Sequence, residues 1–133
     1  MIRRDNFLLL PSVLMMESIP TMDQWESMAN FLLSMQRSLN WYIGDFVVNG
    51  EAQMGDDIYQ AFDLGFSSSL IRRCAAVSRE FPIGERNLNL SWTHHFLAMG
   101  LKKNVQATAL TRAEMECWDT GQFRDYLREL SDG

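Results

Sequence analysis

A glycine and a serine two positions apart divide one stretch of helical sequence into two helices. Gly65 ends a segment that begins near Asp57, and glycine terminates a helix at little cost because it readily adopts a left-handed conformation. Ser67 stands where its hydroxyl can accept a backbone N–H bond and cap the next helix. Ala61 is small enough for two helices to cross closely. The spacing of these residues predicts a helix-turn-helix.

The rest of the chain has mainly helical patterns. After Thr21, apolar residues recur every three or four positions, and Thr21 and Gln24 have the spacing of a capping box. We predict helices over about residues 21–39, 41–48, 56–64, 68–81, 91–99, 105–118 and 121–130. Gly44 is expected at a close helix contact or a kink, and Asn49-Gly50 is expected to form a turn.

Almost nothing in the sequence is typical of a sheet. The apolar segment Phe7–Met16 contains Pro11, which cannot donate to a ladder, so it suits a docked arm or a lone strand better than a central strand. The predicted fold is therefore all-α. It consists of an extended N-terminal arm at residues 1–20 and a compact multi-helix domain at residues 21–133 that contains the helix-turn-helix.

The charges are distributed unevenly along the chain, which has a net charge of −5. Residues 66–112 hold seven basic and two acidic residues, whereas residues 1–65 and 113–133 have net charges of −6 and −4. Binding to a polyanion depends on the local patch, because salt screens exposed charges beyond about 8 Å. The basic segment begins at the helix-turn-helix, and this favours DNA as the ligand.

In a helix-turn-helix, the start of the second helix meets base edges in the major groove. Arginine can pair bidentately with guanine, and serine can contact a base or a phosphate. The sequence leaves open whether Arg72 or Arg73 contacts only phosphate. The predicted DNA-binding residues are Ser67, Ser68, Ser69, Arg72, Arg73, Arg79, Thr93, His94, Lys102 and Lys103.

The order of these elements resembles the DNA-binding region of ParB and KorB partition proteins. The resemblance is carried by the helix-turn-helix, the helix ending in Arg79-Glu80-Phe81-Pro82, and the run Leu90-Ser91-Trp92-Thr93-His94. With Trp41-Tyr42-Ile43-Gly44-Asp45 included, the chain is more similar still to LmbU-like regulators of actinobacteria. Residues 118–128 resemble the closing helix of both families. The resemblance covers about residues 22–130 and implies a sequence-specific duplex DNA-binding protein, but neither CTP binding nor partition.

Other candidate sites favour structural roles. Neighbouring helical residues point about 100° apart, so His94 and His95 are not expected to chelate one metal and suit the core or a cap. Cys74 is expected to be a buried structural thiol. The acidic residues around the third predicted helix are expected to be solvated: Asp56, Asp57 and Asp63. With no phosphate-binding glycine loop or Ser/His/Asp arrangement, we expect no enzyme activity, cofactor or metal.

The segment Phe7–Met16 is too short to cross a bilayer, which takes about 20 residues. Arg3 and Arg4 precede it, but no small-residue cleavage site follows, so we expect no signal peptide. Free thiols at Cys74 and Cys117 suit a reducing compartment. These features predict a cytoplasmic protein without a membrane partner.

Two functions from different classes fit the sequence. The first is a transcriptional regulator of phage or plasmid type that binds duplex DNA as a homodimer, because operators read by this motif are usually paired half-sites. The alternative is an adaptor or inhibitor that keeps the helix-turn-helix shape without binding DNA. It would bind a protein through its acidic or methionine-rich N-terminal half. A shared basic face favours DNA, and acidic residues interrupting that face favour the alternative.

Overall fold

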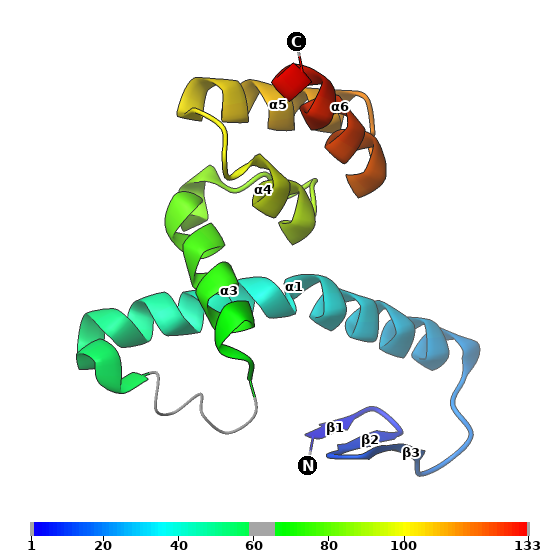
Figure 1. Ribbon diagram of the computed structural model, residues 1–133. Coiled ribbons are helices and arrows are strands. Elements are labelled where there is room, and N and C mark those ends of the chain that lie inside the picture. Colours follow the sequence, from blue (N-terminus) through cyan, green and yellow to red (C-terminus); the bar gives the residue numbers. More distant parts are fainter. Residues whose placement is uncertain (1, 59–65, 133) are drawn as a thin grey trace. The chain divides into compact units, whose positions relative to one another are not determined.

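A computed structural model describes residues 2–58 and 66–132 of the chain (Figure 1). Its contacts divide the protein into two units, Met1–Arg37 and Ser38–Gly133. The boundary falls inside the long helix α1 (Met22–Met54), which contributes to both units. The predicted division of the chain into residues 1–20 and 21–133 stays a prediction, and each unit is described here by itself.

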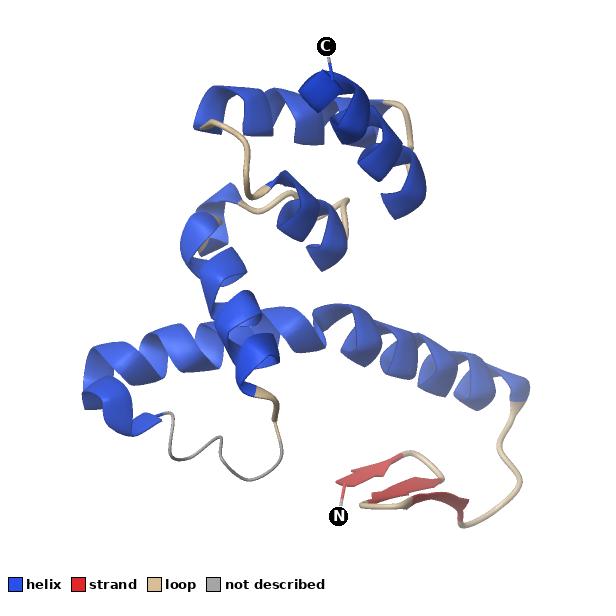
Figure 2. Cartoon of the chain, viewed as in Figure 1, coloured by secondary structure: helices blue, strands red, loops and turns tan. Residues whose placement is uncertain are grey.

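The N-terminal unit contains a small antiparallel sheet, shown in red in Figure 2. Its strands, in the order β1-β2-β3, are β1 (Ile2–Arg4), β2 (Phe7–Leu10) and β3 (Val13–Met16). The described residues are mostly helical, as predicted, but the expectation of an all-α fold with an extended arm is wrong for residues 2–16, which form this sheet. Pro11 lies in the turn between β2 and β3, where its missing N–H removes no ladder bond. The other turn is accommodated by Asp5, whose φ is +53°.

A few aromatic and apolar side chains join this sheet to the start of α1. Phe7 is buried and meets Trp25 edge to face, with ring centres 5.6 Å apart.

The capping box at the start of the helix is confirmed. The Gln24 N–H donates to Thr21 Oγ1 over 3.2 Å, and the Thr21 N–H donates to Gln24 Oε1 over 3.0 Å.

Among its described residues, the C-terminal unit contains helices joined by loops and no strand. After α1 come the 3-10 turn η1 (Gly55–Asp57), α3 (Ser68–Glu80), the 3-10 turn η2 (Ile83–Glu85), α4 (Trp92–Ala98), α5 (Lys103–Met115) and α6 (Thr120–Asp132). The helices predicted near 68–81, 91–99, 105–118 and 121–130 are thereby confirmed. The predicted first helix of the helix-turn-helix, with Ala61 and Gly65, lies outside the described residues.

The predicted turn at Asn49-Gly50 is wrong, because α1 continues through it to Met54. Gly50 serves packing instead. A Cβ atom at Gly50 would lie 2.5 Å from Ile58 Cδ1, so a larger residue at this position would displace the Ile58 side chain that packs there. Ile58 joins a small buried cluster with Val47 of α1 and with Ile71 and Ala75 of α3.

The main core lies between α1, α3 and the three C-terminal helices, with α4 packed against both α5 and α6. Its buried members are Ile43, Cys74, Val77, Phe81, Trp92, Ala98, Ala109, Leu110, Ala113 and Phe123. Helices α1 and α3 cross closely at Gly44, where a Cβ atom would lie 2.3 Å from the Cys74 carbonyl oxygen. The predicted close contact at Gly44 is therefore confirmed, and so is the buried position of Cys74.

Candidate nucleic-acid interface

The helix α3 and its N-cap Ser67 carry six of the ten predicted DNA-binding residues. Ser67 caps it as predicted: the Ser67 hydroxyl accepts the Leu70 N–H over 3.1 Å. The buried side of the helix consists of Ile71, Cys74, Ala75, Val77 and Ser78. Burying this side leaves the predicted contacts exposed, namely Ser68, Ser69, Arg72, Arg73 and Arg79.

The exposed arginines follow one side of α3. Arg72 and Arg79 are seven residues apart, which is close to two full turns, so they lie nearly above one another. Arg73 points toward α4, with its guanidinium carbon 5.2 Å from the centre of the Phe96 ring. Within the described part of the chain, Arg72 has no hydrogen-bond or ion-pair partner. Arg72 is thus the arginine of α3 most available to a ligand.

Two of the predicted basic contacts are engaged by acidic residues. Arg79 pairs with Glu51 of α1. Lys103 donates to the Glu80 carbonyl oxygen over 2.8 Å, and its ammonium lies 3.8 Å from the Glu85 carboxylate. Lys102 is exposed just before α5. The basic face is therefore open at its Arg72 end and interrupted by acids near Arg79 and Lys103.

The α4 residues lie deeper than a phosphate contact would need. His94 is buried and Thr93 is half-buried. His94 Nδ1 accepts the Ser91 N–H over 3.2 Å, which leaves Nε2 protonated to donate to the Trp118 carbonyl oxygen over 2.9 Å. Ser91 Oγ in turn accepts the His94 N–H, completing a capping box. His94 therefore joins α4 to the loop before α6 and is committed to structure.

His95 is fully buried between the rings of Trp41 and Phe81, which it meets edge to face. Its Nε2 accepts the Asn87 N–H over 3.1 Å, so its Nδ1 carries the proton and donates to the Ser91 carbonyl oxygen over 2.8 Å. Burial lowers the pKa of His95 below its usual value of 6.5. The hydrogen bond to Ser91 raises this pKa, but its effect is smaller than that of burial. Both histidines thus act as the core and capping residues that the sequence favoured.

The burial of His95 predicts acid sensitivity. Because its pKa is lower in the folded protein, the unfolded chain binds more protons as the pH falls through 6.5. The free energy of unfolding should then fall with decreasing pH, at no more than about 1.4 kcal/mol per pH unit, until the folded pKa is passed. Histidine titration by NMR checks the cause. A His95 resonance that titrates at or above 6.5 would contradict it.

A clamp between Asp45 and Arg86 fixes the loop after α3, and neither residue is among the predicted site residues. Arg86 donates to both carboxylate oxygens of Asp45, over 2.9 and 2.6 Å, and its Nε donates to the Phe81 carbonyl oxygen over 2.8 Å. Its guanidinium also lies 4.1 Å from the Trp41 ring centre. The hydrogen bonds from Arg86 to the Asp45 carboxylate lower the pKa of Asp45. Its partial burial raises this pKa, but by less. The sequence did contain one indication of this clamp, because Asp45 belongs to the segment Trp41–Asp45 that carries part of the resemblance to LmbU-like regulators.

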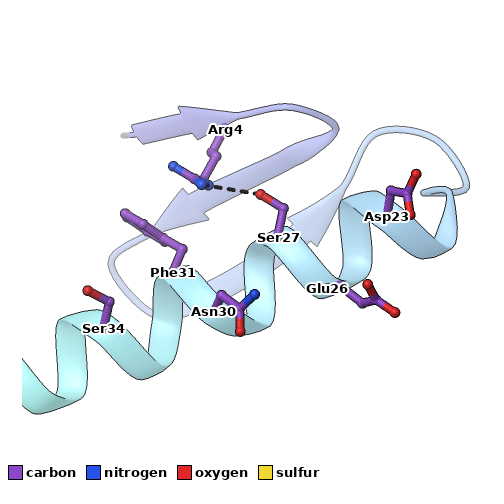
Figure 3. Close-up of a pocket in the computed structure, with 7 residues that line it drawn as sticks. All are labelled: Arg4, Asp23, Glu26, Ser27, Asn30, Phe31 and Ser34. Carbon is purple, nitrogen blue, oxygen red and sulfur yellow. Dashed lines mark hydrogen bonds between the residues drawn. The ribbon is translucent and has the colours of Figure 1, made fainter.

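A pocket of about 560 Å³ lies in the N-terminal unit (Figure 3). Arg4 reaches from β1 to Ser27 Oγ over 3.2 Å, and its guanidinium carbon lies 4.4 Å from the Phe31 ring centre. The remaining lining residues are polar or acidic: Asp23, Glu26, Asn30 and Ser34. Arg4 thus ties the sheet to α1.

Among the described residues, no group of three histidine, cysteine, aspartate or glutamate side chains is placed to hold a metal ion. None of the helices formed by these residues is both long enough and apolar enough to span a membrane.

No protein-family model matches the chain, and no solved structure matches it. Among curated proteins it is similar to the transcriptional regulator NovE of Streptomyces niveus, with 26% identity over 114 residues. The match covers 85% of this chain and 52% of NovE, so the chain spans about half the length of this relative. The similarity agrees with the resemblance to LmbU-like regulators, whereas the ParB- and KorB-like part of the resemblance depends on the sequence motifs.

Proposed function

We propose that this protein is a transcriptional regulator that binds duplex DNA sequence-specifically through α3. The single observation that carries the proposal is the capped and exposed N-terminal half of α3. It presents Ser68, Ser69 and Arg72 to solvent, while the opposite side of the helix is anchored in the core. A helix of this kind can enter the major groove, where arginine reads guanine and serine contacts a base or phosphate.

The similarity to the regulator NovE supports the regulatory part of the proposal. The proposed contacts are narrower than the sequence-based set. They comprise Ser68, Ser69, Arg72, Arg73 and Lys102, because His94 is buried and Arg79 and Lys103 are held by acidic neighbours. The homodimer, the cytoplasmic location and the phage or plasmid type remain predictions of this proposal.

The test begins with selection of bound fragments from a random duplex DNA pool, followed by titration of the selected site. Arg72→Ala should weaken binding to that site by about 5- to 150-fold, because one bidentate guanine contact contributes about 1–3 kcal/mol. If Arg72 contacts only phosphate, binding should weaken similarly for all sequences, with a shallower salt dependence. Salt titrations on specific and scrambled DNA distinguish these two roles.

Arg124→Ala is the matched control, since it removes the same charge from the exposed surface of α6. It should leave DNA binding unchanged. Selection that enriches no sequence, or equal affinities for Arg72→Ala and the unmodified protein, would reject the proposal.

The alternative is a protein-interaction module, and it is favoured by one specific observation. Ion pairs with acidic residues at Arg79 and Lys103 interrupt the basic face. This function predicts no salt-sensitive DNA binding, and it predicts that a protein partner is retained by the Arg72→Ala variant. The two functions therefore differ in the same DNA titration.

A further inference from the structure

The strand β3 exposes all of its side chains, although every one of them is large and apolar. Val13, Leu14, Met15 and Met16 are between 44% and 51% exposed. Within the described residues β3 pairs only with β2, so its other backbone edge carries no strand. Uncovered apolar edge strands of this kind readily pair with another strand.

The N-terminal unit is also too small to supply much stability by itself. Folding units of less than about 40 residues usually need a disulfide, a metal or a second chain. The unit spans Met1–Arg37, whereas the two cysteines, Cys74 and Cys117, both lie in the other unit. Among its described residues, the buried apolar side chains are those of Phe7, Pro20 and Met28. Pairing along β3 would provide the additional burial that this unit lacks.

The charges on the two sheet edges indicate which strand fits. The β1 edge carries Arg3 and Arg4, and charged side chains on an edge oppose pairing with a copy of itself. The β3 edge carries no charge, and the nearest acid, Glu17, is already paired with Arg3. A charged partner strand would have no opposite charge to pair with on β3, whereas the side chains of a neutral apolar strand could pack against those of β3. The chain's own β3 is such a strand.

We propose that β3 pairs antiparallel with β3 of a second copy, joining two sheets into one across a two-fold axis. Centred on Leu14, this pairing places Leu14 opposite its own counterpart and Val13 opposite Met15 of the second copy. Glu17 then meets Pro11 of the second copy, so no like charges face each other. Such an interface uses the same surface on both chains, as a two-fold dimer requires.

This inference depends on the homodimer in the proposed function but not on DNA binding. It is therefore tested on the full chain without DNA. If the protein binds DNA as a monomer, only the dimer is overturned. If it dimerises through β3 but binds no DNA, only the regulatory function is overturned.

The test is sedimentation equilibrium over a range of protein concentrations. We expect the unmodified chain to have the mass of two copies. Leu14→Lys places two ammonium groups opposite each other at the axis, and it should raise the dissociation constant at least about tenfold. Ile2→Lys is the matched control. It adds the same charge to an exposed position on β1, at the other edge, and should leave the dimer unchanged.

A charge pair separates loss of the interface from loss of folding. Leu14→Glu alone should dissociate like Leu14→Lys, and an equimolar mixture of the two variants should recover the two-copy mass. A misfolded variant would not be rescued by its opposite charge. A monomeric unmodified protein, a Leu14→Lys variant that stays dimeric, or a mixture that stays monomeric would overturn the proposal. Association with neutral lipid vesicles in place of self-association would overturn it equally.

Discussion

Gly44→Ala is expected to destabilise the C-terminal unit by about 2–3 kcal/mol, because the new methyl group has no space between α1 and α3. Its Cβ would lie 2.3 Å from both the Cys74 carbonyl oxygen and Ser78 Oγ. The serine can rotate, but the carbonyl belongs to the backbone of α3, so the two helices would have to separate. Urea unfolding followed by circular dichroism measures the loss.

Two controls sharpen this prediction. Gly84→Ala should change stability by only a few tenths of a kcal/mol, because no atom lies within 4 Å of its Cβ position and its φ is not positive. Adding Ser78→Ala to Gly44→Ala should not restore stability, because the carbonyl contact remains. A Gly44→Ala protein as stable as the unmodified one would show that the helices do not cross at this distance.

The second large effect is expected for Arg86→Ala, which should cost about 2–3 kcal/mol of unfolding free energy. The substitution removes both hydrogen bonds to Asp45 and the bond to the Phe81 carbonyl oxygen, and it uncovers the Trp41 ring. Only 11% of the Arg86 side chain is exposed, so water can replace few of these contacts. Asp45 is left partly buried without its counter-charge.

Arg128→Ala provides the matched comparison, since Arg128 forms an ion pair with Asp125 in which both side chains are mostly exposed. Exposed pairs contribute little, and this variant should change stability by less than about 0.5 kcal/mol. Arg86→Lys should recover only part of the loss, because an ammonium group cannot form the two parallel bonds. Equal stabilities of the Arg86→Ala and Arg128→Ala proteins would contradict the clamp.

Several local features could be predicted because their causes lie within a few residues. The caps at Thr21 and Ser67 were recognisable from hydroxyl-bearing residues that stand just before helical patterns. The C-terminal helices were recognisable from apolar residues at the helical period. The sheet could not be predicted from Pro11, because proline argues against a central strand but is tolerated in the turn between two short strands that it occupies.

The residues of the candidate interface also divide into those whose position follows from local sequence and those whose position does not. Exposure of Ser68, Ser69, Arg72 and Arg73 follows from the helical pattern, because the apolar residues of α3 define its buried side. Engagement of Arg79 by Glu51 does not follow, since the two residues are 28 positions apart and meet only when α1 and α3 pack. The same holds for Asp45 and Arg86, which are 41 positions apart.

By itself, the sequence determined where the helices of the C-terminal unit begin, which side of α3 is buried and which of its residues face solvent. These properties depend on hydrogen bonds and periodicity within one helix. The tertiary structure alone decided that Gly50 packs against Ile58, that Arg86 pairs with Asp45 and that Arg72 keeps its charge available while Arg79 does not. Those outcomes depend on which residues that are distant in the sequence come within a few ångströms of one another, and these distances cannot be derived from the local sequence.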